Sequence, residues 1–249
     1  MNSNLITTHL EFALAQLASE SYLDGIDFSD QTELLRGRLL LGSNSYRIFL
    51  NPFERTLPGQ SRFTDSLADR LLDQKEIIRH HANDASGFSA TLMWDRAANT
   101  YTLSFRSTEY RSQNEGGDFE RDRSPTAIPT PGLGANAEIF SHGFALGQLL
   151  AMQRYYQSLL ASGQIPSDAK INVTGYSLGG HLATVFTELN LINVEQAYTF
   201  NSPGRGGFAN VERLEGLEAL EIGKMLARLD AVLYDPAAAN PYEYTTSQL

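Results

Sequence analysis

The sequence predicts an α/β protein with a mostly parallel central sheet and helices on both faces of that sheet. Segments with strand and helix patterns alternate from residue 87 onward, which is typical of a sheet with parallel central strands. The chain has 249 residues, of which 42% are hydrophobic, so it can bury a sizeable core. Because no internal repeat or boundary interrupts the pattern, we expect one domain over residues 1–249, with a mainly helical part over residues 1–80.

The chain is expected to begin with an amphipathic helix, because apolar residues recur at helical spacing between residues 6 and 17. A further helix is expected in "RFTDSLADRLLDQKEII", residues 62–78. Two β segments follow, "GFSATLMW" at 87–94 and "TYTLSFR" at 100–106, with the short connection "DRAAN" between them. The chain therefore changes from helical to β-rich character near residue 87.

A polar stretch over residues 111–136 separates these strands from the next helix. It is rich in glycine, proline and charged residues, and structureless loops longer than about 15 residues are uncommon inside compact domains. Such a loop is often an active-site lid, and the alternative is an Ω-like excursion over the surface.

After this loop, helix and strand patterns alternate to the end of the chain. The expected elements are a helix over 145–159 that ends near Gly163, the strand "INVT" at 171–174, a helix with a buried face over 182–189, the strand "EQAYTF" at 195–200 and a candidate strand "MLARLDAV" at 225–232.

Charge and composition exclude several classes of function. The formal net charge of −10 argues against electrostatic binding of nucleic acid or of an anionic membrane surface. No metal or cofactor is expected, because the chain has no cysteine and its aspartates in "LDGIDFSD" lack the spacing of an EF-hand loop. Neither a Sec-type signal peptide nor a transmembrane segment is expected. We expect a soluble protein, secreted by a route without an N-terminal signal peptide or otherwise cytoplasmic.

The stretch "VTGYSLGGHL", residues 173–182, carries a serine between two glycines in the pattern G-x-S-x-G. This pattern, with a strand before it and a helix after it, indicates a nucleophile elbow with Ser177 at its apex. Side chains at Gly175 and Gly179 are expected to collide with the neighbouring strand and helix. The N–H of Leu178 lies at the start of the helix, where it can donate to a developing oxyanion. The alternative is a purely structural glycine-serine turn.

Four stretches in register resemble the fungal-type, or class three, lipases of the α/β-hydrolase fold: "SFRSTE", "SHGF", "VTGYSLGGHLA" and "YTFNSPGRGGFAN". The resemblance covers residues 87–210 and looks closest to the bacterial branch of the family, whose lipase-like domain often belongs to a larger exported protein. It implies an α/β-hydrolase fold and a carboxylic-ester hydrolase of lipids, either a triacylglycerol lipase or a phospholipase A. The implied partners are a lipid or ester substrate and, transiently, a lipid interface, which Phe119, Ile128 and Leu133 would contact.

The resemblance also implies roles for individual residues. Thr108 stands at the end of Phe-Arg-Ser-Thr, where the family has Phe-Arg-Gly-Ser/Thr, and is the implied second oxyanion donor through its backbone N–H and hydroxyl. Ser107 replaces the family's glycine, and Arg106 is expected to hold the loop structurally. His142 matches a family position before the helix that precedes the elbow, where a structural role is expected.

A serine hydroxyl needs a general base that is oriented by an acid. The family order is serine, acid, histidine, so Asp230 is the implied acid and Asp235 its competitor. The histidines are His9, His80, His81, His142 and His181, and none follows His181. His181 is expected to be a buried packing residue.

Three explanations for the missing base remain open. The chain is a fragment whose continuation carries the histidine, or His80 or His81 folds back over the site, or the site is inactive. The last case would make the protein a non-catalytic or incomplete hydrolase-fold binding module. A peptidase or thioesterase of similar fold is a further alternative.

Overall fold

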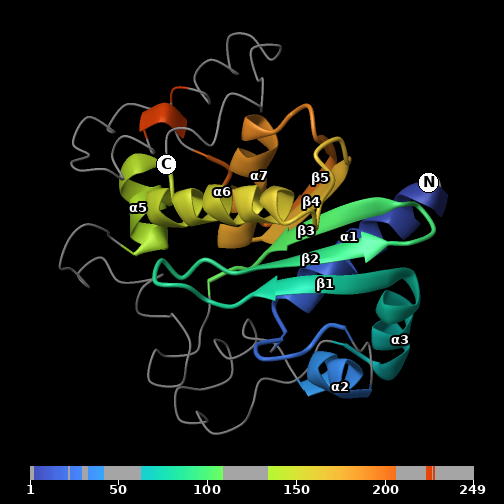
Figure 1. Cartoon of the computed structure of the whole chain (residues 1–249). Helices are drawn as coiled ribbons and strands as arrows, with labels where there is room; N and C mark the ends of the chain where they lie inside the picture. The colour runs from blue at the N-terminus through green and yellow to red at the C-terminus, as the bar shows by residue number, and fades with distance from the viewer. Residues whose placement is uncertain are drawn as a thin grey trace, which may run out of the picture.

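The computed structural model describes residues 3–21, 23–29, 33–41, 63–108, 134–205, 223–225 and 227. In this part of the chain a five-stranded sheet lies between helices (Figure 1). The strands are adjacent in sequence order: β1 (Lys75–His81), β2 (Ala90–Asp95), β3 (Thr100–Phe105), β4 (Ile171–Tyr176) and β5 (Val194–Phe200).

The strand directions confirm the predicted sheet. Strand β2 is antiparallel to both β1 and β3, whereas β3, β4 and β5 are mutually parallel. Four of the five described strands therefore run in one direction, with β2 alone opposed to them. The carboxyl ends of β3, β4 and β5 consequently meet at one edge of the sheet, where ligand sites of α/β proteins usually form.

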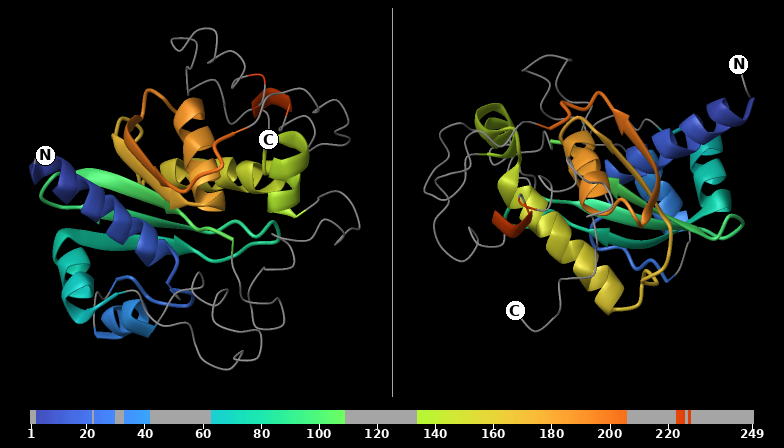
Figure 2. Two further views of the ribbon diagram at one scale, coloured as in Figure 1. Left: turned by 180° about the vertical axis from the view of Figure 1, so that it is seen from behind. Right: turned by 90° about the horizontal axis from the view of Figure 1, so that it is seen from above.

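Helices cover both faces of the sheet, as predicted. Figures 1 and 2 show α6 (Leu146–Ala161) and α7 (Leu178–Leu189) on one face and α1 (Ser3–Ser19) on the other. Neighbouring residues of β2 show the same division, since Leu92 belongs to the core cluster with α6 and α7, whereas Met93 belongs to the cluster with α1. Successive side chains of a strand point to opposite faces, so each face has its own apolar core.

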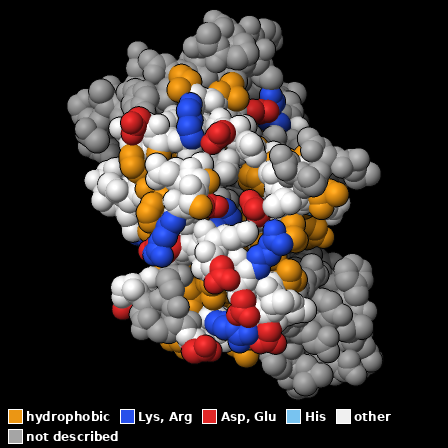
Figure 3. All heavy atoms as spheres, turned by 90° about the vertical axis from the view of Figure 1, so that its right-hand side faces the viewer, with side chains coloured by type: hydrophobic (Ala, Val, Ile, Leu, Met, Phe, Trp, Pro, Cys, Tyr) orange, Lys and Arg blue, Asp and Glu red, His pale blue; other side chains and the backbone are white. Residues whose placement is uncertain are grey.

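The remaining helices lie at the two ends of the molecule. Helices α2 (Glu33–Leu41) and α3 (Asp65–Gln74) join α1 in the second core cluster, next to β1. Helix α5 (Ala135–His142) is short and contacts α6. No helix among the described residues combines the length and the apolar character needed to cross a bilayer. On the face shown in Figure 3, acidic and basic side chains are interspersed with apolar ones.

The helix predicted over residues 62–78 is wrong at its end, over residues 75–78. Helix α3 begins after Thr64, whose side chain caps it by accepting a hydrogen bond from the N–H of Leu67, and ends at Gln74. Strand β1 then starts at Lys75, because this segment forms an antiparallel ladder with β2 and buries Ile77 against the core. Pairing with a distant strand thus overrides the helical pattern of the local sequence.

Other predicted elements are confirmed or only partly described. The helices and strands expected at 6–17, 145–159, 171–174, 182–189 and 195–200 are all present. The candidate strand at 225–232 is wrong where it is described, since residues 223–225 and 227 are helical. The stretch 111–136 lies outside the described residues up to 133, and α5 already begins at Ala135.

Candidate active site

Ser177 forms a sharp turn between β4 and α7. Its backbone has φ 51° and ψ −116°, a conformation that is costly for any residue with a Cβ atom and that concentrates at functional sites. The turn is held on both sides, because the N–H of Ser177 donates to the carbonyl of Phe200 at 2.9 Å and its carbonyl accepts from the N–H of His181 at 3.1 Å. Ser177 as a whole residue is partly exposed.

The two glycines of the pentapeptide are required by close packing, as the sequence predicts. A Cβ atom on Gly175 would lie 2.1 Å from the carbonyl oxygen of Gly179, and one on Gly179 would lie 2.3 Å from that of Phe105. Gly180, which the sequence analysis did not single out, is equally restricted, since its Cβ would lie 2.7 Å from Cβ of Ser202. These contacts place the first turn of α7 directly against the ends of β3 and β4.

The first turn of α7 provides the backbone donors of the site. Leu178 is the first residue of the helix, and the first N–H groups of a helix have no acceptor within it. The helix dipole adds a partial positive charge at the same end. The side chain of Leu178 is buried in a small cluster with Ala135, Ile139 and Ala145, which fixes α7 against α5.

The sheet register brings Thr108 to the same edge as Ser177. Phe105, at the end of β3, pairs with Gly175 near the end of β4. Thr108 follows the end of β3 and Ser177 follows the end of β4, so both residues come after neighbouring strand ends. Thr108 is 5% exposed, and its Oγ1 accepts a hydrogen bond from Nδ2 of Asn136 at 2.8 Å. A hydroxyl carries one proton and two lone pairs. Because Asn136 occupies a lone pair, the proton of Thr108 is left to donate to another acceptor.

Asn136 is a functional candidate that the sequence analysis missed. It lies at the start of α5, within the stretch that was interpreted as a loop, and no local pattern distinguishes it from other polar residues there. Asn136 is identified only by its hydrogen bond to Thr108, which lies 28 positions earlier in the chain.

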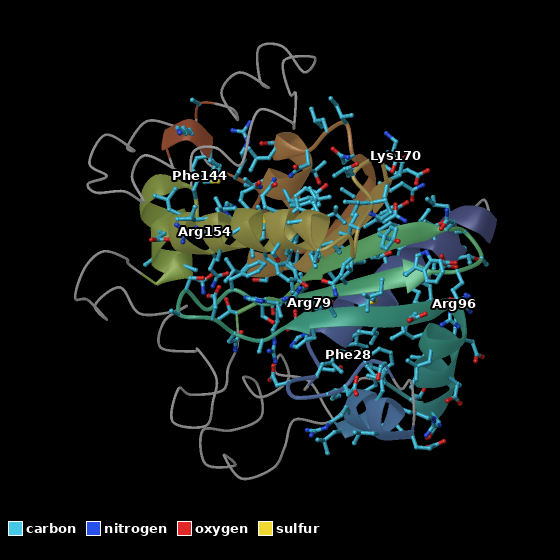
Figure 4. The ribbon with its side chains drawn as sticks, viewed as in Figure 1. Phe28, Arg79, Arg96, Phe144, Arg154 and Lys170 are labelled. Carbon is cyan, nitrogen blue, oxygen red and sulfur yellow. The ribbon has the colours of Figure 1, made fainter. Side chains whose placement is uncertain are left out.

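His181 is buried and structural, as predicted. Its Nε2 accepts from the N–H of Ala145 at 3.2 Å, so Nδ1 carries the proton and donates to the carbonyl of Gly204 at 2.6 Å. The ring of Phe144, which Figure 4 shows beside α5, meets the imidazole edge-on. Burial lowers the pKa of His181, and the hydrogen bond to Gly204 opposes this shift only in part. Both ring nitrogens are therefore occupied in a neutral ring.

The hypothesis that His80 or His81 folds back over the site is wrong. Both belong to β1, which β2 and β3 separate from β4. His81 is level with Gly175, but three strand spacings of about 4.8 Å place it about 14 Å away. His80 instead contacts Thr91 Oγ1 at 2.9 Å through Nδ1 and Asp24 at 3.2 Å through Nε2.

The other predicted partners are only partly described. Asp230 and Asp235 lie outside the described residues, as does the side chain of His142. His9 packs against the rings of Tyr198 and Phe200, on the face that α1 covers. Within the described part of the chain, the hydroxyl of Ser177 makes no hydrogen bond to a histidine. The structure thus brings Ser177, Leu178 and Thr108 to one edge of the sheet, and the roles of these residues, like those of Asp230 and Asp235, stay predictions.

A buried acid of α5 contacts the start of α6. Glu138 of α5 accepts a hydrogen bond from the N–H of Gly147 at 3.4 Å, at the start of α6. Burial raises the pKa of Glu138 to about 7, while hydrogen bonds from the backbone of Gly147 and Leu146 act in the opposite direction. The acid therefore caps a helix whose own N-cap residue, Ala145, offers no side-chain acceptor.

A strand, a strained serine and a helix at the carboxyl edge of a mostly parallel sheet make the fold α/β-hydrolase-like. No protein-family model and no curated protein matches the sequence. The structure is similar to the Lip2 lipase of Yarrowia lipolytica, with a TM-score of 0.44 and 17% identity over 84% of this chain and 64% of that one. It is also similar to a lipase of Rhizopus microsporus var. chinensis, with a TM-score of 0.45 and 14% identity over 90% of this chain and 64% of that one.

A third similar structure is a Rhizomucor miehei lipase propeptide complex, with a TM-score of 0.40 and 17% identity over 90% of this chain and 58% of that one. The chain thus spans less than two thirds of the length of each of these fungal lipases.

Proposed function

We propose that the protein is a carboxylic-ester hydrolase of lipids, either a triacylglycerol lipase or a phospholipase A, with Ser177 as its nucleophile. The observation that supports this most directly is the conformation of Ser177, a partly exposed serine held at positive φ at the start of α7. The four stretches that resemble class three lipases agree with this proposal, and within it we assign the chain to the bacterial branch of that family.

In the proposed reaction, Ser177 Oγ attacks the carbonyl carbon of the ester while a general base takes its proton. The carbonyl oxygen becomes an oxyanion, which the N–H of Leu178 and the N–H and hydroxyl of Thr108 stabilise. The intermediate then collapses, the alcohol leaves with the proton from the base, and an acyl-Ser177 ester remains. A water molecule repeats the sequence on this ester and releases the fatty acid.

The base is a histidine in this proposal, oriented by Asp230 or by its competitor Asp235. The four histidines with described side chains pack or hydrogen-bond elsewhere. Among the chain's own histidines this leaves His142 as a candidate, and a histidine from a further segment is the other source. We also propose that the enzyme is exported and meets its substrate at a lipid interface.

The test combines covalent labelling with turnover. Wild-type protein is treated with a fluorophosphonate probe, the modified peptide is identified by mass spectrometry, and hydrolysis of nitrophenyl esters of increasing acyl length is measured. We expect labelling at Ser177 and loss of both signals in Ser177→Ala. Ser162→Ala, which removes an exposed hydroxyl at the end of α6, is the matched control and should behave as wild type.

A non-catalytic binding module is the second candidate, because no histidine with a described side chain makes a hydrogen bond to the hydroxyl of Ser177. This hypothesis predicts that folded wild-type protein does not react with the fluorophosphonate probe and hydrolyses none of the esters. If both His142→Ala and Ser177→Ala abolish turnover, the binding-module hypothesis is excluded and His142 is identified as the base. Turnover restricted to thioesters or peptides would instead replace the lipid substrate by another acyl donor.

A further inference from the structure

The loop that carries Thr108 is attached to the end of α1 by a buried carboxylate. Glu20 follows directly after α1, and each of its oxygens accepts a hydrogen bond from Ser107. The backbone N–H of Ser107 donates to Oε1 at 2.9 Å, and its hydroxyl donates to Oε2 at 3.0 Å. Glu20 is fully buried and Ser107 is 5% exposed. Two parallel bonds to one carboxylate fix both the backbone and the side chain of the residue before Thr108.

Gln16 also holds Glu20, and a separate hydrogen bond attaches the end of α1 to β3. Gln16, one helical turn earlier, donates from Nε2 to Oε1 of Glu20 at 3.0 Å. Ser19 is joined to Ser104 of β3 by a hydrogen bond of 2.9 Å between their hydroxyls. The end of α1 is thus attached twice to the same stretch of chain, once to the strand at Ser104 and once to the loop at Ser107.

Charged and titratable groups surround the contact between Glu20 and Ser107. Burial raises the pKa of Glu20, while the positive charge of Arg106 and the hydrogen bonds from Ser107 and Gln16 oppose this rise. Arg106 is only 3% exposed, so its positive charge lies in the interior together with this acid. His80 of β1 faces the same region, and burial and the charge of Arg106 lower its pKa, although its hydrogen bond to Asp24 acts in the opposite direction. The buried positive charge of Arg106 therefore acts on both Glu20 and His80.

We propose that Glu20 is a positioning residue for the proposed ester hydrolysis, because it fixes through Ser107 the turn from which Thr108 donates to the oxyanion. This inference rests on the proposed function. It also accounts for Ser107 at a position where the resembling family has glycine, since the hydroxyl supplies the second of the two bonds to Glu20. Thr108 is then held from two sides, by Asn136 of α5 and by Glu20 after α1.

The test compares Ser107→Ala and Glu20→Gln with Ser104→Ala. Ser104→Ala is the matched control, because it removes a buried hydrogen bond between the same two elements without touching the loop. Removing a single oxyanion donor outright lowers kcat by about 10²–10³-fold, and loosening the loop should have part of that effect. We expect kcat for a nitrophenyl ester to fall at least about tenfold in Ser107→Ala and Glu20→Gln, with KM within about twofold of wild type.

A second readout does not need turnover. Hydrogen exchange, measured by mass spectrometry on peptides spanning residues 105–108, should accelerate at least about tenfold in Glu20→Gln and in Ser107→Ala, but not in Ser104→Ala. Thermal unfolding is measured for every variant to check that the variant is folded. Ser107→Ala leaves Glu20 and Arg106 unchanged, so the test stands even if Glu20→Gln fails to fold.

The two proposals can fail separately. If wild-type protein neither labels nor hydrolyses esters, the proposed function is wrong, and the exchange data still decide whether Glu20 holds the loop. If wild-type protein is active but Ser107→Ala matches Ser104→Ala in kcat and in exchange, Glu20 is merely structural and the inference is overturned.

Discussion

A methyl group added to Gly175 should both destabilise the protein and disable the elbow. Its Cβ would lie 2.1 Å from the carbonyl oxygen of Gly179, 2.3 Å from the carbonyl carbon and 2.8 Å from the nitrogen of Gly180. All three are backbone atoms of α7, so no side chain can rotate away, and relief requires the helix to move by about 1 Å from β4. Overpacking of this kind costs about 3 kcal/mol. A shift of about 1 Å in the nucleophile lowers the rate by about 100-fold.

The assay measures urea unfolding and fluorophosphonate labelling on Gly175→Ala and on Gly37→Ala. Gly37 lies in α2, and nothing lies within 4 Å of a Cβ atom added there. Alanine favours a helix over glycine by about 1 kcal/mol, so Gly37→Ala should be as stable as wild type or more stable, with normal labelling. If Gly175→Ala keeps wild-type stability and labelling rate, the close contact of β4 with α7 is wrong, and with it the geometry assigned to Ser177.

Four further predictions follow from single contacts. Asn136→Ala should lower kcat about tenfold without a large change in KM, because the Thr108 hydroxyl loses the donor that orients it; unchanged kcat would remove Asn136 from the site. The raised pKa of Glu138 means that the folded state holds this proton more tightly than the unfolded state, so stability should fall by up to about 3 kcal/mol as pH rises from about 4.5 to about 7. Glu138→Gln should remove this slope in urea titrations at several pH values, and an identical slope would refute the assignment. The free energy of unfolding of Ser177→Gly should be about 1 kcal/mol larger than that of Ser177→Ala, since only glycine tolerates positive φ without strain. His81→Ala should label at the wild-type rate, and a large loss would contradict its placement on β1.

Local patterns predicted most of the fold. The α/β alternation, the direction of β3, β4 and β5, and the glycines at 175 and 179 all follow from periodicity or from steric requirements within a few residues. The segment after Gln74 was predicted wrongly, because its strand forms only through pairing with β2. Helical and strand periods are difficult to separate in short apolar runs, and a distant partner then decides.

The candidate site likewise contains residues that a local pattern predicts and residues that only distant contacts reveal. Ser177 and Leu178 belong to one continuous stretch, so a strand–serine–helix pattern is enough to predict them. Asn136 and Glu20 act on the loop of Thr108 from segments 28 and 87 positions away from the residues that they contact. No spacing in the sequence encodes such contacts, because they depend on how α1 and α5 pack around the end of β3.

The strain at Ser177 must be offset by contacts elsewhere, and β5 supplies one of them directly. The N–H of Ser177 donates to the carbonyl of Phe200, the last residue of β5, while the ladder between β4 and β5 runs up to Tyr176 and Phe200. A residue held at positive φ costs about 1–3 kcal/mol, and one buried hydrogen bond returns only about 1 kcal/mol of that. The rest has to come from the packing of Gly175 and Gly179, where β3, β4 and α7 meet at backbone distance. The conformation of Ser177, the proposed nucleophile, is therefore set by the docking of β5 and α7 onto the sheet, and weakening either contact should relax Ser177 before the fold itself is lost.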